Sequence, residues 1–274
     1  MALIFVIPVR HPDSVPDWGI VKRDLAQTLA SIAAQEPGGE WECRIVANRG
    51  ADLPPLPAGC HVRHVDLPLP ALPDRNRDRQ AYFDAIRHDK GLRLYTAVDD
   101  VDPRDHVMVV DFDDLVSRRL ARLVAANPEA PGWYFDWGYI FSGRGRLCYL
   151  KRRFNHTCGT SHVLRRDLIG PFETAAGEPD MAMIKRHLGS HLFVQKDLME
   201  AGTPLAPLPF PGAFYRIGNP QSTIGTGGLA RALTPPPAFL RHPWGILRYP
   251  WRMMRRAMNC RLIDARLREE FTLA

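Results

Sequence analysis

Three aspartates, Asp111, Asp113 and Asp114, follow directly after the apolar run at 107–110. That run, Val-Met-Val-Val, is mostly β-branched, which predicts a buried central strand. Carboxylates this close together disfavour one another's ionised form, and a bound divalent cation removes that cost. Oxygen ligands of this kind suit magnesium or manganese. One Asp would also serve as the N-cap of a helix beginning near Leu115, but three carboxylates at one strand end favour a ligand site.

The elements before this cluster must place it at a sheet edge. Apolar runs predict strands at 3–9, 42–47, 61–67 and 107–110, and apolar residues at helical spacing predict helices at 21–32 and 80–98. Strands separated by helices in this way indicate βαβ units and a largely parallel sheet. Ligands of open α/β sheets bind at the carboxyl ends of the strands, where the aspartates are expected.

The second half of the chain departs from this rhythm. We expect a helix at 115–126, an aromatic strand at 133–141 that turns through 142–145 into a strand at 146–150, a helix at 180–188 and a Pro-rich loop at 203–211. The fold class predicted is therefore α/β, with a mixed, mainly parallel sheet flanked by helices. We expect residues 1–127 and 128–232 to form the two halves of one domain, and 233–274 to form a helical tail.

Composition excludes several classes of protein. The five cysteines are scattered and none lies in a Cys-x-x-Cys pair, so neither a zinc site nor a disulfide framework is indicated, and a cytoplasmic protein is expected. The apolar first residues lack the basic start of a signal peptide and predict a strand. No apolar run approaches the ~18 residues of a membrane span.

The formal charge of +6 is concentrated at the C-terminal end. Residues 239–274 hold eight arginines and three acidic residues, which leaves 28 basic and 27 acidic residues elsewhere. A nearly neutral body argues against nucleic-acid binding. One apolar stripe at helical spacing, with arginines beside it, predicts a basic amphipathic helix in the tail; its members are Trp251, Met254, Met258, Leu262 and Ala265. Such a helix could lie on the inner face of an anionic membrane or pack on the protein itself, and the sequence leaves both open.

Taken in order, these and later motifs resemble the GT-A fold glycosyltransferases, most of all family 2 enzymes of bacterial polysaccharide synthesis. The resemblance covers roughly residues 3–225, and it implies that 1–127 is the nucleotide-binding half and 128–232 the acceptor-binding half of one domain. The residues that carry it are Pro8-Val9-Arg10, Asn48, Asp89-Lys90-Gly91, Asp111-Phe-Asp113, the run 159–166, Glu178-Pro-Asp180 and the run 215–222.

The resemblance implies a role for each matching position. Pro8, Val9 and Arg10 would lie along the nucleotide of the donor, and Asn48 stands where family members often place an acidic residue near the base. Lys90 would contact the diphosphate. Asp111 and Asp113 match the pair that engages ribose and metal, so manganese or magnesium is the implied cofactor. A uridine diphosphate sugar is the expected donor, and a carbohydrate or lipid-linked molecule the expected acceptor.

Asp180 matches the usual base of inverting family members. A carboxylate there would take the proton of the attacking acceptor hydroxyl, although at a helix start it would serve equally well as an N-cap. His191 is the candidate for an additional metal ligand. Trp137, Thr160 and Ser161 are candidates for acceptor contacts, against core packing or a turn as their ordinary roles.

Other functions remain open at this point. A phosphatase of the haloacid dehalogenase type also has a strand ending in Asp-x-Asp, but that motif usually opens the fold, whereas here over 100 residues precede it. A sugar-phosphate nucleotidyltransferase would need a Gly-rich loop after the first strand. A non-catalytic nucleotide-sugar-binding protein, or a scaffold at a membrane surface, is the remaining alternative.

Overall fold

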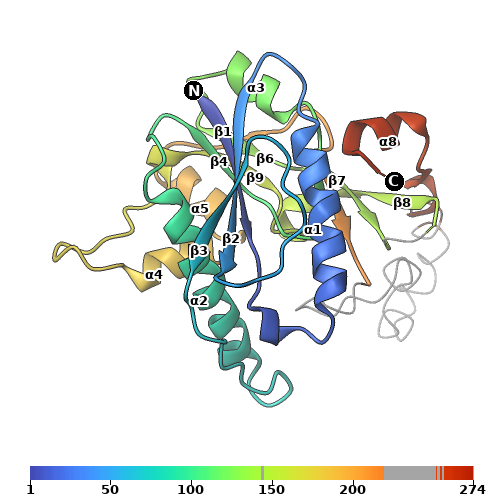
Figure 1. Cartoon of the computed structure of the whole chain (residues 1–274). Helices are drawn as coiled ribbons and strands as arrows, with labels where there is room; N and C mark the ends of the chain where they lie inside the picture. Colours follow the sequence, from blue (N-terminus) through green and yellow to red (C-terminus); the bar gives the residue numbers. More distant parts are fainter. Residues whose placement is uncertain (143–144, 219–250, 252–253, 255, 274) are drawn as a thin grey trace.

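Four parallel strands of the first half form one side of the larger sheet, with β3 at its edge (Figure 1). The computed structural model describes residues 1–142, 145–218, 251, 254 and 256–273. In these residues β1 (Ala2–Pro8) pairs in parallel with β2 (Glu40–Asn48) and with β4 (His106–Val109), and β2 pairs in parallel with β3 (Cys60–Val65). The prediction of a largely parallel sheet from strand–helix alternation is confirmed for this half.

The second half extends the same sheet. Strand β9 (His162–Arg165) runs antiparallel to β4 and to β6 (Gly132–Tyr134), and β10 (Ala206–Pro207) pairs in parallel with β6. Within the described residues the order is β10-β6-β9-β4-β1-β2-β3. The fold is thus α/β with mixed sheets, compatible with a Rossmann-like arrangement, and both halves build one sheet.

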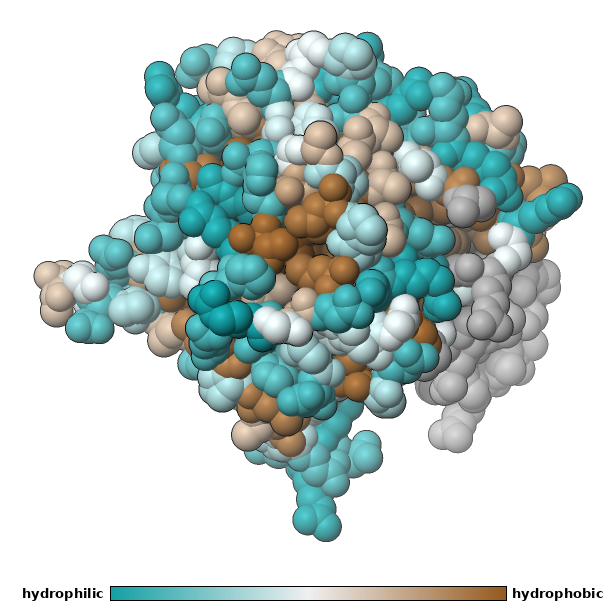
Figure 2. Space-filling model, in the orientation of Figure 1, coloured by the Kyte–Doolittle hydropathy of each residue, from teal (hydrophilic) through white to brown (hydrophobic). Residues whose placement is uncertain are grey.

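Helices cover both faces of this sheet because its two faces are apolar. α1 (Trp18–Ala33) and α3 (Leu120–Ala126) pack on one face, and α2 (Arg79–Val98) packs on the other with the π-helical turn η4 (Ile184–Leu188) and α5 (Val194–Glu200). Asp17 and Asp78 begin α1 and α2 as N-caps, each accepting a backbone N–H. Figure 2 shows that the outer surface is mostly hydrophilic on the side viewed, with a hydrophobic patch near its middle and other hydrophobic areas below it.

A smaller sheet stands beside the first. Its order is β12-β8-β7-β11-β5 in the part of the chain that the structure describes. The members are β5 (Leu115–Val116), β7 (Trp137–Phe141), β8 (Leu147–Arg152), β11 (Ala213–Arg216) and β12 (Cys260–Leu262). The antiparallel β7–β8 hairpin confirms the turn predicted between them. Short turns of 3-10 helix, η1 (Pro12–Ser14), η2 (Phe154–His156) and η3 (Arg166–Leu168), connect other elements.

Two predicted elements were wrong for the same reason. The helix expected at 115–126 begins only at Leu120, because Leu115 and Val116 pair with β11 nearly 100 residues later. The single strand expected at 133–141 is two strands in different sheets, since the chain changes sheet at Phe135, whose N–H bonds the Ser161 carbonyl. Distant pairing partners decided both cases.

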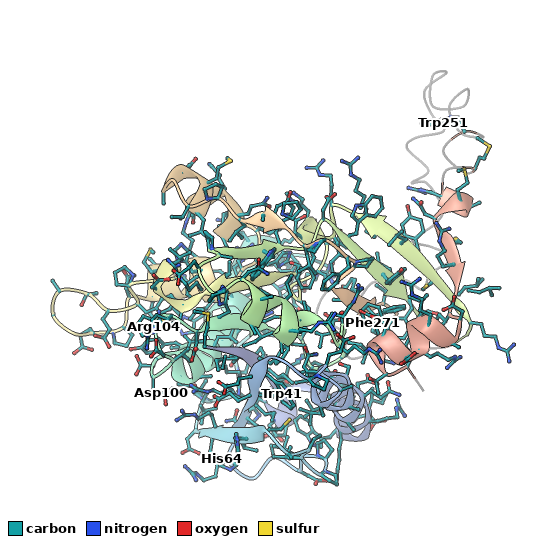
Figure 3. All side chains as sticks on the ribbon, turned by 90° about the horizontal axis from the view of Figure 1, so that it is seen from above. Trp41, His64, Asp100, Arg104, Trp251 and Phe271 are labelled. Carbon is teal, nitrogen blue, oxygen red and sulfur yellow. The ribbon has the colours of Figure 1, made fainter. Side chains whose placement is uncertain are left out.

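The continuous helix predicted for the tail was also wrong where the structure describes it. Leu262 lies in β12, and a separate helix, α8, spans Ala265–Phe271 after its N-cap Asp264. α8 buries Phe271 against Phe214 and Tyr139 of the smaller sheet, whereas Trp251 lies away from the body (Figure 3). The prediction for 233–250 lies outside the described residues. No helix among those described has the length and apolar character to cross a bilayer.

Phe271→Ala tests whether α8 is held by this aromatic contact. The ring is 1% exposed and its centroid lies 4.7 Å from that of Phe214. We expect the free energy of unfolding, measured in urea, to fall by about 3–5 kcal/mol. Leu262→Ala, at a side chain that is 66% exposed, is the control and should change it by less than about 0.5 kcal/mol. Equal effects of the two variants would contradict the packing of α8.

Candidate active site

A cavity of about 510 Å³ opens where β1 and β4 end. The strand after β1 in the chain, β2, lies on one side of β1, whereas β4 lies on the other, so the strand order reverses between β1 and β4. Ligands of open α/β sheets bind at such a reversal point. Pro8 and Arg10 follow β1, Asp111 and Asp113 follow β4, and all four line the cavity. In Figure 1 this edge lies at the lower end of β1, above η1.

An ion pair crosses the cavity wall. Lys90 Nζ on α2 donates to Asp111 Oδ1 over 2.6 Å. Burial opposes the charge of this ammonium, but the Asp111 carboxylate outweighs that effect and raises the pKa of Lys90. The pair packs closely against Gly159, because a Cβ at this position would lie 2.8 Å from Asp111 Oδ2 and 3.2 Å from Lys90 Nζ. A cation and a carboxylate therefore lie together in the cavity wall, against a residue that has to be glycine.

Asp114 holds the turn that carries the other two aspartates. Its carboxylate is fully buried and accepts from the Thr160 hydroxyl at 2.6 Å, from the Cys158 thiol at 3.1 Å and from the Arg216 N–H at 3.2 Å. The same Thr160 hydroxyl accepts the backbone N–H of Asp111 at 2.9 Å. Burial and the two neighbouring carboxylates raise the pKa of Asp114. The third aspartate is thus a structural group that fixes the turn.

A buried arginine supports the other wall. Arg93 is 1% exposed and makes two 3.0 Å hydrogen bonds to Asp89, and both residues line the cavity. Its remaining nitrogen donates to Asn48 Oδ1 at 2.7 Å, while Asn48 Nδ2 donates to the Leu67 carbonyl at 2.6 Å. Asn48, expected to contact the donor, does not line the cavity. Both ends of its amide are occupied, so it orients Arg93 instead.

The first turns of α2 contribute a face that the sequence analysis missed. Arg79, Phe83, Ile86 and Arg87 line the cavity together with Lys90. Phe83 and Ile86 belong to the apolar spacing that predicts this helix, but the apolar side chains of the helix are buried in the core only from Leu94 onward. The basic residues that recur at helical spacing with Lys90 were the available signal, because they place positive charge on one face.

A histidine group lies behind this cavity. His191 lines it, and its Nε2 is buried with no hydrogen-bond partner among the described residues. Burial and the nearby Lys90 lower the pKa of His191 to about 4. His162 on β9 is 7% exposed, its Nε2 is likewise unpartnered within the described chain, and burial lowers its pKa to about 3. Both imidazoles are therefore neutral near pH 7.

The carboxylates of this cavity could hold a divalent cation only if oxygen atoms of a bound substrate completed its coordination. In the described ranges no three His, Cys, Asp or Glu side chains are arranged to hold a metal, so the geometry gives His191 no support as a third protein ligand, and that role stays a prediction. Magnesium, however, is commonly bound through one or two carboxylates and substrate phosphates. Asp111 and Asp113 supply two carboxylates to one cavity.

Four other predicted contacts are not available in this arrangement. Val9 is fully buried in the core, and Thr160 and Ser161 are fully buried with their hydroxyls bonded to Asp114 and His162. Trp137 lies in the smaller sheet, 6.0 Å from the Arg152 guanidinium, and does not line the cavity. The structure instead places Tyr215, from the predicted 215–222 run, in the wall. Residues 219–222 of that run lie outside the described residues.

Asp180 does not line the cavity either. Its carboxylate accepts the N–H groups of Ala182 and Met183 at 3.0 and 3.1 Å, as the N-cap of the short helix α4 (Met181–Met183). The loop before α4 projects from the body in Figure 1. Of the two roles that the sequence left open, this structure supports the cap, and the inference of an inverting reaction loses the residue on which it rested.

Comparison with known proteins adds no family to this description. No protein-family model matches the chain, and no curated protein matches it significantly.

Asp114→Asn tests the structural role of the buried carboxylate. An amide has only one oxygen, so its NH2 group replaces an acceptor either of the Arg216 N–H or of the Thr160 hydroxyl and the Cys158 thiol, and at least one of these donors loses its hydrogen bond. We expect the free energy of unfolding at neutral pH to fall by about 1–3 kcal/mol. Asp102→Asn, at an exposed turn, is the matched control. Unfolding curves that coincide for the two variants would contradict this role.

Acid titration tests the buried His162. Its pKa is lowered from 6.5 to about 3 on folding, so the unfolded chain binds a proton that the folded chain excludes. Stability should therefore fall as pH drops below 6.5, by up to about 1.4 kcal/mol per pH unit from this residue, until about pH 3. His162→Gln should flatten that slope in urea unfolding between pH 6.5 and 4, and His61→Gln, at an exposed residue, should not. A slope unchanged in His162→Gln would disprove the assignment.

Proposed function

We propose that the chain is a glycosyltransferase that uses a nucleotide diphosphate sugar, with a uridine diphosphate sugar as the expected donor. One observation carries the proposal. Arg10, Lys90, Asp111 and Asp113, which the family resemblance had assigned to the donor, come from three separate elements and line one cavity at the reversal point of the sheet. The α/β architecture supports it, because that edge suits a nucleotide.

The charges of the cavity suit the bond that must break. In the transfer, the bond between the anomeric carbon and the diphosphate oxygen breaks, and its electrons leave with the diphosphate. Lys90 and Arg10 are positioned to stabilise that growing negative charge. A divalent cation held by Asp111 and Asp113 would neutralise further phosphate charge when bound. The acceptor oxygen forms the new bond to the anomeric carbon, and its proton passes to a base.

The walls of the cavity indicate how the donor would lie. The diphosphate belongs beside Lys90, and Arg93 with Asp89 forms a fixed polar wall. A bidentate arginine–carboxylate pair with a buried arginine keeps its geometry without a ligand, which lowers the cost of ordering the site on binding. The carbohydrate or lipid-linked acceptor would approach from the open side of the cavity.

Asp113→Asn is the direct test of this function. The variant should keep its fold yet bind UDP in the presence of manganese at least about tenfold more weakly, the size seen even for groups that only support a metal ligand. Binding is measured by calorimetry and sugar transfer by UDP release, with Asp102→Asn as the control.

The outcomes separate the remaining functions. Undiminished UDP affinity in Asp113→Asn would contradict the metal role. Tight UDP-sugar binding with no release of UDP in the presence of any acceptor would instead favour a non-catalytic nucleotide-sugar-binding protein.

A further inference from the structure

A second, smaller cavity of about 30 Å³ adjoins the first. Gly159, Ser190 and His191 line both cavities, so the smaller one lies at the end of the site where Lys90 and Asp111 meet. A single water needs about 10–15 Å³ measured in this way, so the space admits a group of a few heavy atoms.

The walls of this side cavity are mostly apolar. Val107 on β4, Leu164 on β9, Val194 on α5 and Ile169 after η3 line it, and each is at most 7% exposed. His162 and His191 also line the side cavity, and each has an unsatisfied imidazole nitrogen, Nε2. Both are buried, and neither has a hydrogen-bond partner within the described residues. A third lining histidine, His187, is already bonded to Asp197.

Unpartnered buried nitrogens in an apolar pocket indicate a ligand group, because leaving them unbonded is costly. A neutral imidazole offers one N–H donor and one lone-pair acceptor. A ligand group that forms hydrogen bonds with both imidazole nitrogens and also fills the apolar space would carry a carbonyl oxygen, an N–H and a methyl. A hydroxyl would leave the apolar walls empty. A carboxylate or an ammonium would bring an uncompensated charge into the pocket.

We propose that the side cavity is a subsite for an acetamido group on the transferred sugar, at the carbon next to the anomeric one. This inference rests on the proposed function. The position follows from the walls that the two cavities share, because a sugar whose diphosphate lies beside Lys90 places that carbon near Gly159 and His191. His162 is then a specificity-determining residue at the bottom of the subsite. Its imidazole is neutral at pH 7, which suits an uncharged amide.

The test compares two donors that differ only in this group, UDP-N-acetylglucosamine and UDP-glucose. Dissociation constants are measured by calorimetry with manganese for the whole chain. The wild type should bind the acetamido donor about tenfold more tightly or better, a size typical of filling an apolar pocket and pairing its polar groups. His162→Leu, which removes the hydrogen bond, should bring the two constants within about twofold while leaving UDP-glucose binding unchanged.

A second variant tests the same subsite independently, in case His162→Leu does not fold. Val194→Met fills the side cavity from α5 and should also abolish the preference. Leu198→Met, one turn later on the same helix and outside the cavity, should retain it.

Three results would overturn the inference. Equal affinities of the wild type for both donors would mean that the side cavity holds water only. A preference that persists in both His162→Leu and Val194→Met would place acetamido recognition elsewhere. If neither donor binds, the proposed function fails together with this inference, whereas binding without preference removes only the subsite.

Discussion

The buried carboxylate of Asp114 is the interaction on which the site depends. It ties the turn after β4 to the loop before β9 through Thr160 and Cys158, and to β11 through the Arg216 N–H. The Arg216 side chain in turn donates to the Asp113 carbonyl at 3.2 Å. Three segments distant in the sequence therefore fix the backbone that presents Asp111 and Asp113. A polar side chain in a fully buried position is tolerated because each of its two oxygens has a hydrogen-bond partner.

The topology of the sheet places this turn at the cavity. β1 and β4 are neighbours whose connections run to opposite sides, so a crevice opens at their carboxyl ends. α2 extends beyond the sheet along this crevice and adds Arg79, Arg87 and Lys90 from one helical face. The core holds the helix by its second half, from Leu94 onward, so its first half is free to line the cavity.

Local patterns in the sequence predicted what local interactions determine. The parallel strands, α1 and α2 followed from apolar spacing, and the aspartates after β4 followed from strand-end chemistry. The pairing of strands distant in the sequence could not be predicted, because β5 pairs with β11 and β12 pairs with β8. The same limit applies to single residues. Thr160 was predicted to face an acceptor, but its hydroxyl is bonded to Asp114, 46 residues earlier, and Asn48 is occupied by Arg93, 45 residues later.

The central claim is that two carboxylates and a lysine in this cavity bind a nucleoside diphosphate together with a divalent cation. The most direct measurement is the thermal unfolding midpoint of the protein with each nucleoside diphosphate, with manganese and with chelator, because a ligand of the native state raises it in proportion to its binding. The account predicts a clear rise with UDP that requires manganese. No rise with any nucleoside diphosphate, or an equal rise in chelator, would contradict it.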